Sequence, residues 1–135
     1  MNFRANPTFR AGSWSALQSL LVPKVIAAVT NGAQAVLEIS QQYVPYRTGA
    51  LAASGGVEVE WSGNRITGAV SYTAPYAAYN EFGTGRRGAE SGHGGPGIEY
   101  DPNWPGMSGH PYLRPALDSG RPQILAAFSD AGFTI

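Results

Sequence analysis

A long amphipathic segment constrains the fold of this chain more than any other feature of its sequence. Over residues 22–44, apolar residues recur at steps of three and four positions with polar residues between them, which is the spacing of a helix with one apolar face. Such a helix is about 33 Å long. Pro23 suits its first turn, and Pro45 ends it because the residue before a proline avoids helical geometry. The sequence therefore predicts a long helix that needs a second layer to cover its apolar face.

An antiparallel hairpin is the predicted second layer. Apolar residues alternate with charged or small residues over 57–61 and again over 66–72, and the Ser-Gly-Asn sequence at 62–64 is typical of a turn. Because an isolated hairpin is marginal in water, its apolar face should pack on the long helix, and further strands or a neighbouring subunit should complete the sheet. We expect Val29, Val36 and Leu37 of the helix to cover the hairpin. The hairpin residues beneath them are Val59, Trp61 and Val70.

Two shorter helices are predicted after the hairpin. Residues 74–82 have a proline at their second position and are followed by Gly83, which is typical of a short helix closed by a glycine cap. Pro115 begins a final helix, which is interrupted near Gly120. With 43% hydrophobic residues the chain can bury a core, and 135 residues is the usual size of one compact domain. The predicted fold class is α+β, with a single domain over residues 19–135.

Residues 1–18 are predicted to form an N-terminal arm, because they show no sustained helical or strand period. They carry three large aromatic residues, Phe3, Phe9 and Trp14. A frayed terminus is one interpretation of this segment. The other is an arm that docks on a neighbouring protein, because large aromatic side chains are costly to leave in water. Both interpretations stay open at the level of sequence.

Residues 83–109 form a glycine- and proline-rich stretch, longer than the roughly 12 to 15 residues at which structureless loops become uncommon. Its glycines lose much backbone entropy on ordering, which predicts a loop that is mobile in the isolated chain. The loop also carries large apolar side chains, for which a linker that only contacts water has no use. We therefore expect it to order on a neighbouring subunit or a partner ring, with Tyr100 and Trp104 as the main contacts.

Composition and charge argue against several classes of function. Nine basic and nine acidic residues give a formal net charge of zero, so no overall field favours nucleic acid or a membrane surface. The absence of cysteine removes disulfides and thiolate chemistry, and it fits a protein that matures in a reducing cytoplasm. No run approaches the roughly 18 apolar residues that span a bilayer, so we expect a soluble protein without a membrane segment.

The local basic features are Arg86 and Arg87 on the glycine-rich loop, together with Arg4, Arg10 and Lys24 near the N-terminus. One interpretation is an ordinary solvated surface. The other applies to a symmetric ring, where adjacent arginines on a loop are repeated in every subunit and give a channel a positive band.

Two patterns resemble cofactor or metal sites, but each lacks the context that such a site needs. Residues 83–88 have the glycine spacing of a dinucleotide-binding fingerprint, yet they follow a predicted helix instead of a strand and precede a predicted loop instead of a helix. His93 and His110 are the only histidines, and a flexible loop separates them. No cofactor site and no metal site is therefore predicted.

An enzyme active site is not predicted either. Ser91, His93 and Asp101 could supply a nucleophile, a base and an orienting acid, but they lie on one glycine-rich loop with no rigid element to hold them. Glu81 could act as a general acid, whereas a helix cap or an ion pair with Arg47 is its more ordinary role. A small hydrolase that uses Glu81 or His93 stays as the enzyme alternative, and a free-standing peptide-binding module as a third.

Three short motifs occur in order along the chain: V-P-Y-R-T-G-A-L at 44–51, Y-A-A-Y-N-E-F-G-T at 76–84 and P-Y-L-R-P-A-L at 111–117. With these motifs the chain resembles, over residues 22–130, the tail-completion or neck proteins of long-tailed bacteriophages. The motif residues that carry a structural role in this interpretation are Pro45, Thr48, Gly49, Leu51, Glu81, Gly83 and Pro115.

The resemblance implies an α+β structural subunit that forms a ring, a hexamer being favoured, between the connector of the capsid and the tail tube. It implies no catalysis and no cofactor. The implied partners are the connector or stopper and the tail terminator or tail tube proteins, with incidental DNA contact in the lumen and no membrane contact. The implied location is the neck of the virion, after assembly in the host cytoplasm; a tail terminator or another minor tail protein is the alternative within this class. The residues expected at interfaces are Phe3, Phe9, Trp14, Arg86, Arg87, Tyr100 and Trp104.

Overall fold

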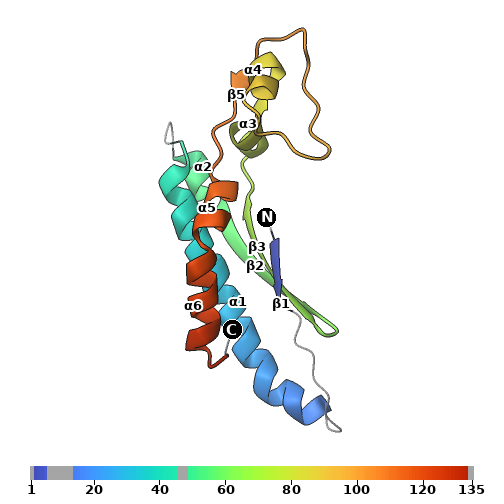
Figure 1. The fold of residues 1–135 in the computed structure, drawn as a ribbon, viewed down its shortest axis with the longest axis vertical. Helices are drawn as coiled ribbons and strands as arrows, with labels where there is room; N and C mark the ends of the chain where they lie inside the picture. The colour runs from blue at the N-terminus through green and yellow to red at the C-terminus, as the bar shows by residue number, and fades with distance from the viewer. Residues whose placement is uncertain (1, 6–13, 46–48, 134–135) are drawn as a thin grey trace.

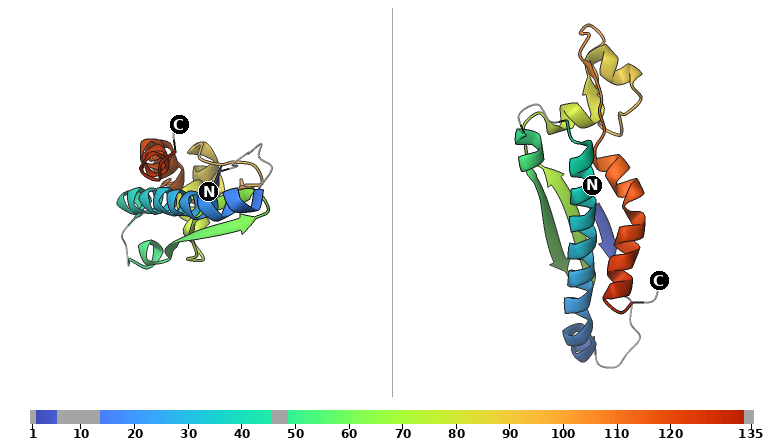
Figure 2. Two further views of the ribbon diagram at one scale, coloured as in Figure 1. Left: turned by 90° about the horizontal axis from the view of Figure 1, so that it is seen from below. Right: turned by 90° about the vertical axis from the view of Figure 1, so that its left-hand side faces the viewer.

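The molecule is elongated, with a body of helices and sheet and a small lobe at one end of its long axis (Figures 1 and 2). The computed structural model describes residues 2–5, 14–45 and 49–133, with only the backbone described for 2–5 and 14–17. Helix α1 (Trp14–Tyr43) and helix α6 (Arg121–Asp130) lie side by side along the body, and the sheet packs on α1. The predicted α+β fold class is confirmed.

Helix α1 has 30 residues and forms the long axis of the body. It ends at Tyr43, before Pro45, as predicted. Its start is earlier than predicted, so Pro23 lies inside the helix and not in its first turn. The residues before Pro23 include alanine, leucine and glutamine, which favour a helix. Pro23 is also exposed, so its ring displaces no packed side chain and the helix continues through it.

One face of α1 is buried at the predicted steps of three and four residues. Its buried side chains are Val25, Ala28, Val29, Ala33, Val36, Leu37 and Ser40, and the buried Val44 follows directly after the helix. Val25 and Val29 belong to one core cluster, Ala33, Val36 and Leu37 to a second, and Val44 to a third. The apolar face of α1 therefore contributes to the whole core of the body.

The same helix corrects one expectation from the sequence. Within the described residues, Gln18–Tyr43 is long and apolar enough to cross a membrane by length and composition. Lys24 and Glu38 interrupt the segment, so it contains no continuous run of 18 apolar residues, but its mean hydropathy is still high. Of its apolar window, 39% is buried inside the protein, and core helices of soluble proteins pass the same test.

The main sheet has the order β1-β3-β2, with antiparallel neighbours throughout. Strands β2 (Gly55–Ser62) and β3 (Arg65–Tyr72) form the predicted hairpin, and Gly63 and Asn64 make its turn. The register pairs Val57 with Val70, so the alternating apolar residues of the two strands share one face. That face packs on α1, as predicted.

Strand β1 (Asn2–Ala5) is a third strand that the sequence pattern did not predict. It pairs with β3, so the predicted arm at 1–18 contains an edge strand and the first residues of α1. A strand of four residues is too short to show a period, and its partner strand lies far away in the sequence. Phe9 lies outside the described residues, and no side chain is described for Phe3 or Trp14, so their docking role stays a prediction.

Trp61 is not covered by the helix, contrary to the prediction. Its side chain is 54% exposed, and its indole nitrogen donates to the carbonyl of Gly63 at 2.9 Å. Val25 and Val29 of α1 pack on Ile66, the cross-strand neighbour of Trp61, instead. Trp61 lies near the end of the edge strand β2, whereas Ile66 lies on the central strand β3, which the helix covers.

Short helices complete the body. Helix α2 (Ala50–Ala53) connects α1 to the hairpin, and α5 (Leu113–Ser119) precedes α6. The predicted interruption at Gly120 is confirmed. A Cβ atom at Gly120 would stand 2.7 Å from the carbonyl oxygen of Ala116 and 3.2 Å from a methyl of Val36. Glycine at this position therefore lets the α5–α6 junction approach α1, which Figure 2 shows between α6 and the hairpin.

Replacing Leu37 by alanine tests this packing. Leu37 is 8% exposed and belongs to the cluster that joins α1 to Val70 and Ala116. We expect Leu37→Ala to lower the free energy of unfolding by about 2–3 kcal/mol, since lost burial and a residual cavity both contribute. Urea denaturation would measure it. Leu20→Ala, at a position of the same helix that is 68% exposed, is the control and should leave stability nearly unchanged; equal effects of the two substitutions would contradict the packing.

Candidate functional site

The glycine-rich segment is folded into the lobe, which we define as residues 77–109. It contains helix α3 (Ala77–Phe82), strand β4 (Gly83–Thr84), helix α4 (Gly85–Glu90) and strand β5 (Met107–Ser108), and β4 pairs with β5. In Figure 1 it stands beyond the C-terminal end of α1. The structure thus differs from the predicted loop without a shape of its own.

Glycine allows the strands of the lobe to approach so closely that backbone packs on backbone. Gly106 has a φ of 61°, and a Cβ atom there would overlap the carbonyl group of Thr84. Gly83 ends α3 with a φ of 81°, and a Cβ atom there would stand 2.7 Å from the carbonyl oxygen of Met107. Gly83 and Gly106 are therefore required by the contacts of the folded lobe.

Hydrogen bonds then fix the returning chain. The amides of Arg86 and Arg87 donate to the carbonyls of Trp104 and Pro105, each at 2.9 Å. The hydroxyl of Tyr100 donates to the carbonyl of Phe82 at 2.8 Å. The side chain of Tyr100 is half-buried, and its hydroxyl is used inside the lobe. The predicted contact of Tyr100 with a partner stays a prediction.

Glu81 connects the lobe to the body. Its side chain is 4% exposed, and its carboxylate accepts the amides of Tyr112 at 2.8 Å, Leu113 at 3.0 Å and Arg114 at 3.1 Å. These amides lie at the start of α5, where the helix itself offers them no acceptor. Glu81 is therefore a helix cap supplied from another element, with its negative charge at the positive end of the helix dipole. Arg47, the predicted ion-pair partner, lies outside the described residues.

Tyr112 forms the second connection between the lobe and the body. It is 1% exposed, and its hydroxyl donates to the carbonyl of Ala77 at 2.9 Å. Burial raises the pKa of this hydroxyl, and the nearby Glu81 and Tyr72 raise it further, so the phenol stays protonated and keeps its hydrogen bond. Its ring meets that of Tyr72 edge to face at a centroid distance of 4.9 Å. The Tyr72 hydroxyl in turn lies 2.6 Å from the Oγ of the buried Ser40 in α1.

The three sequence motifs meet at this junction. One core cluster combines buried residues from all of them: Val44, Leu51, Ala52, Ala77 and Tyr112. Gly49 is the N-cap of α2, Pro115 lies in the first turn of α5, and Pro45 is half-buried after α1. Thr48 lies outside the described residues. The motif residues thus hold elements together.

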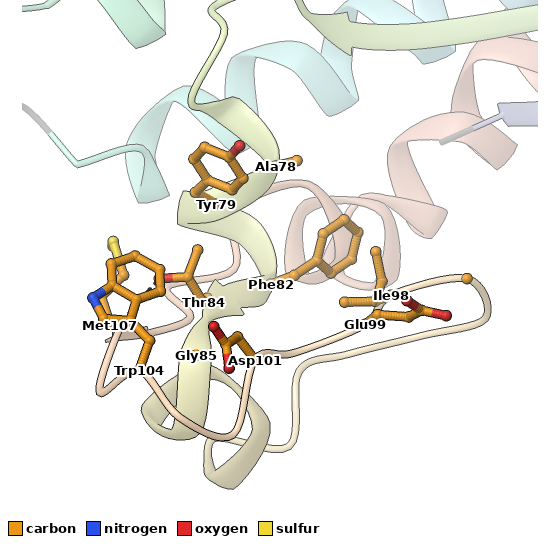
Figure 3. Close-up of a pocket in the computed structure, with 12 residues that line it drawn as sticks. Ala78, Tyr79, Phe82, Thr84, Gly85, Ile98, Glu99, Asp101, Trp104 and Met107 are labelled. Atoms are coloured by element: carbon orange, nitrogen blue, oxygen red, sulfur yellow. Dashed lines mark hydrogen bonds between the residues drawn. The ribbon is translucent and has the colours of Figure 1, made fainter.

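An exposed aromatic surface lies on the lobe and beside it. Four large apolar side chains form it, and they are 38–56% exposed: Tyr76, Tyr79, Trp104 and Met107. We call these residues the aromatic surface. Tyr79 and Met107 line two adjacent cavities: one of about 560 Å³ that Trp104 also lines, and one of about 460 Å³ that Tyr76 also lines. Figure 3 shows the first cavity, with Trp104 and Met107 on one side and Phe82 and Ile98 on the other.

Sequence reasoning found only part of this surface. Trp104 was predicted as a contact residue, and it is 54% exposed. Tyr76 and Tyr79 were not singled out, although their spacing of three residues at a short helix places them on one side of it. Of the predicted basic residues, Arg86 and Arg87 are exposed on α4 and Lys24 is exposed on α1. Arg10 lies outside the described residues, and no side chain is described for Arg4.

Two of the candidate catalytic residues, Glu81 and Ser91, make hydrogen bonds to the backbone. Glu81 and His93 line one cavity of about 530 Å³, but both oxygens of Glu81 accept backbone amides. The Ser91 hydroxyl donates to the carbonyl of Gly88 at 2.7 Å and accepts the amide of Gly109 at 3.2 Å. Within the described ranges, no group of three or more histidine, aspartate and glutamate side chains could hold a metal ion.

The glycine fingerprint at 83–88 has a strand and a helix, contrary to the predicted context. The strand has two residues and the helix six, however, so neither is the buried strand or long helix of a dinucleotide site. A Cβ atom at Gly85 would stand 2.8 Å from the amide nitrogen of Gly106, so the turn is filled by the protein's own backbone.

Comparison with known proteins places this geometry in a family. No curated protein and no solved structure matches the chain significantly. A family model described as "Bacteriophage HK97-gp10, putative tail-component" matches residues 15–83, half of the chain. The match begins with α1, includes the hairpin and α3, and ends where the glycine-rich part of the lobe begins. The chain therefore belongs to the HK97-gp10-like family of bacteriophage tail components, which are structural proteins.

Proposed function

We propose that this protein is a structural subunit of the virion that forms a closed ring at the junction between head and tail. The observation that carries the proposal is the aromatic surface of the lobe. Exposed apolar patches of this kind mark contact sites between proteins, and aromatic side chains next to pockets dominate the energy of many interfaces. Membership in a family of tail components supports an assembly role over an enzymatic one.

The sheet offers a second surface for assembly. Its order leaves β2 at one edge, where no further strand pairs with it among the described residues. Strand β2 has eight residues, and alternate residues along it present backbone donors and acceptors on the outer side, with Glu58 and Glu60 exposed. Sheet edges of this length are usually covered. A neighbouring subunit in a ring would cover it, and a hexamer is the ring size that the resemblance favours.

In such a ring, the exposed Arg86 and Arg87 of every copy would lie at equivalent positions around the axis. If they face the lumen, they form a positive band beside the passing DNA. The proposed partners are the connector or stopper on the head side and the tail terminator or tail tube proteins on the tail side. The proposed location is the neck of the virion, after assembly in the host cytoplasm.

The family description favours one alternative, a tail terminator or another minor tail protein, because it names a tail component without naming the neck. The position of the protein in the particle decides between them. Labelled virions viewed by electron microscopy should carry the label at the head–tail junction under our proposal. A label at another position along the tail would favour the alternative.

Replacing Trp104 by alanine tests the ring. Because Trp104 is 54% exposed, the substitution should leave the melting temperature of the subunit nearly unchanged. It should weaken assembly about 30-fold or more, which is the effect of losing an interface hot spot. Mass photometry over a dilution series measures the assembly. Leu125→Ala removes an exposed large apolar side chain from α6, outside both proposed assembly surfaces, and is the control. Rings of equal stability in both variants would contradict the proposed role of the lobe.

A further inference from the structure

The larger cavity of the lobe combines apolar walls with an acidic rim. It lies between α3 and the returning segment 97–104, and Phe82, Ile98 and Trp104 contribute to its walls. Glu99 and Asp101 also line it, and both are exposed. Figure 3 shows Asp101 between the two apolar sides and Glu99 next to Ile98. The cavity thus offers space for an apolar side chain beside carboxylates.

In the described part of the chain, neither of these carboxylates forms an ion pair. The ion pair found there joins Arg121 to Asp118, on α5 and α6. One oxygen of Asp101 accepts the amide of Asn103 at 2.8 Å, and a carboxylate can accept several further hydrogen bonds. An occupant with an apolar side chain next to a cationic one would complement both parts of the cavity.

The N-terminal sequence contains such an occupant twice. Residues 3–5 and 9–11 are both Phe-Arg-Ala, and no acidic residue occurs before Glu38. The first of the two tripeptides lies in β1 and is paired with β3. The second contains Phe9 and Arg10 and lies outside the described residues.

The reach of the chain excludes the lobe of the same copy as its binding site. Phe9 stands five residues before Trp14, so it lies within about 18 Å of the start of α1. Helix α1 is about 45 Å long at its rise per residue, and the lobe lies beyond its other end (Figure 1). Phe9 can therefore meet this cavity only on a second copy of the chain.

We propose that Phe9 and Arg10 of one copy bind in the lobe cavity of the next copy. Phe9 packs against Trp104 and Phe82, and Arg10 pairs with Asp101 and Glu99. The contact joins the end of one subunit at which α1 begins to the lobe of its neighbour. It is therefore heterologous and repeats in one direction around a closed ring. The inference rests on the proposed ring. It identifies Phe9 and Arg10 as the residues that bind at the aromatic surface of the neighbouring subunit.

Disulfide trapping tests the contact directly, because the natural chain has no cysteine. Ala11→Cys and Glu99→Cys are placed in separate, differently tagged full-length chains, which leaves Phe9, Arg10 and Asp101 intact. After mixing and mild oxidation, we expect a disulfide-linked heterodimer, since bridging requires the two Cβ atoms within about 4.5 Å. Ala11→Cys mixed with Asp118→Cys is the matched control. Asp118 is also an exposed acidic residue, but it lies on α5 and should give no heterodimer.

Charge reversal provides an independent readout in uncrosslinked protein. Arg10→Glu and Asp101→Arg should each weaken assembly about tenfold, and the two together should restore it, because the pair is then reversed. Arg121→Glu, at the exposed ion pair of the body, should leave assembly unchanged.

The outcomes separate this inference from the proposed function. Rings that form without the heterodimer and without rescue by the double reversal would overturn the contact and leave the ring in place. If the cavity variants assemble normally but no longer attach to heads or tails, its occupant belongs to another virion protein, which also overturns the inference. A natural chain that stays monomeric and is missing from virions would overturn the proposed function itself.

Discussion

Replacing Glu81 by alanine should lower the free energy of unfolding by about 3–5 kcal/mol, because buried amides at the start of α5 then lose a charged acceptor. Three amides donate to this carboxylate, and the side chain is 4% exposed, so water cannot easily replace it. The same substitution removes a main link between α3 and α5. Urea denaturation followed by circular dichroism measures the loss, and hydrogen exchange should show faster exchange at Tyr112, Leu113 and Arg114.

Glu81→Gln is the informative companion variant. It keeps one oxygen as an acceptor but loses the charge and the second acceptor, so we expect roughly half of the loss seen with alanine. Glu60→Ala removes an exposed carboxylate from β2 and should change stability little. A Glu81→Ala protein as stable as the natural one would show that the cap has no structural importance. It would also reopen the question of why a carboxylate is buried there.

Replacing Gly106 by alanine should destabilise the lobe by about 2–5 kcal/mol, combining the cost of a left-handed residue with that of steric overlap. The φ of Gly106 is 61°, and the added Cβ atom would overlap the carbonyl of Thr84 across the β4–β5 pair. The effect should stay local, since the core clusters of the body do not include this residue. Hydrogen exchange is the measurement. The amides of Arg86 and Arg87, hydrogen-bonded in the natural lobe, should become fast.

Gly95→Ala is the matched control for this experiment. A Cβ atom at Gly95 would meet no atom within 4 Å, and its φ is not in the positive region. It should leave exchange in the lobe unchanged and slightly reduce the entropy of the unfolded chain. If Gly106→Ala preserved slow exchange at Arg86 and Arg87, the close approach of β4 to β5 would be wrong. Fast exchange in the natural protein would restore the mobile loop that the glycine content first indicated.

The body of the protein was predicted well because its signals are local. The apolar stripe of α1, the stop at Pro45 and the turn at 62–64 each depend on a few neighbouring residues. The errors in the body have different causes. Pro23 was taken for a helix start, although an exposed proline can lie inside a helix whose other contacts outweigh its missing hydrogen bond. Strand β1 escaped prediction because pairing with a distant strand, and no pattern of its own, defines it.

The candidate site was harder to predict because long-range contacts build it. Trp104 was recognised by its size in a glycine-rich segment, whereas Tyr100, equally large, turned inward to donate to Phe82. No local signal distinguishes the two. Glu81 had been considered as a cap, but the helix that it caps begins more than thirty residues later, at Leu113. The glycine content was the most misleading signal, because glycine is frequent in mobile loops and also in folded segments whose backbones pack closely together.

The two ends of the lobe lie side by side, since the amide of His110 donates to the carbonyl of Asn80 at 2.6 Å. A segment with adjacent ends can grow, shrink or change its sequence without altering the path of the chain on either side of it. The family match stops at Gly83, within three residues of this crossing point. Tail proteins could therefore keep one body and acquire a new neighbour by exchanging a single stretch of chain, much as an antibody exchanges a loop on a fixed framework.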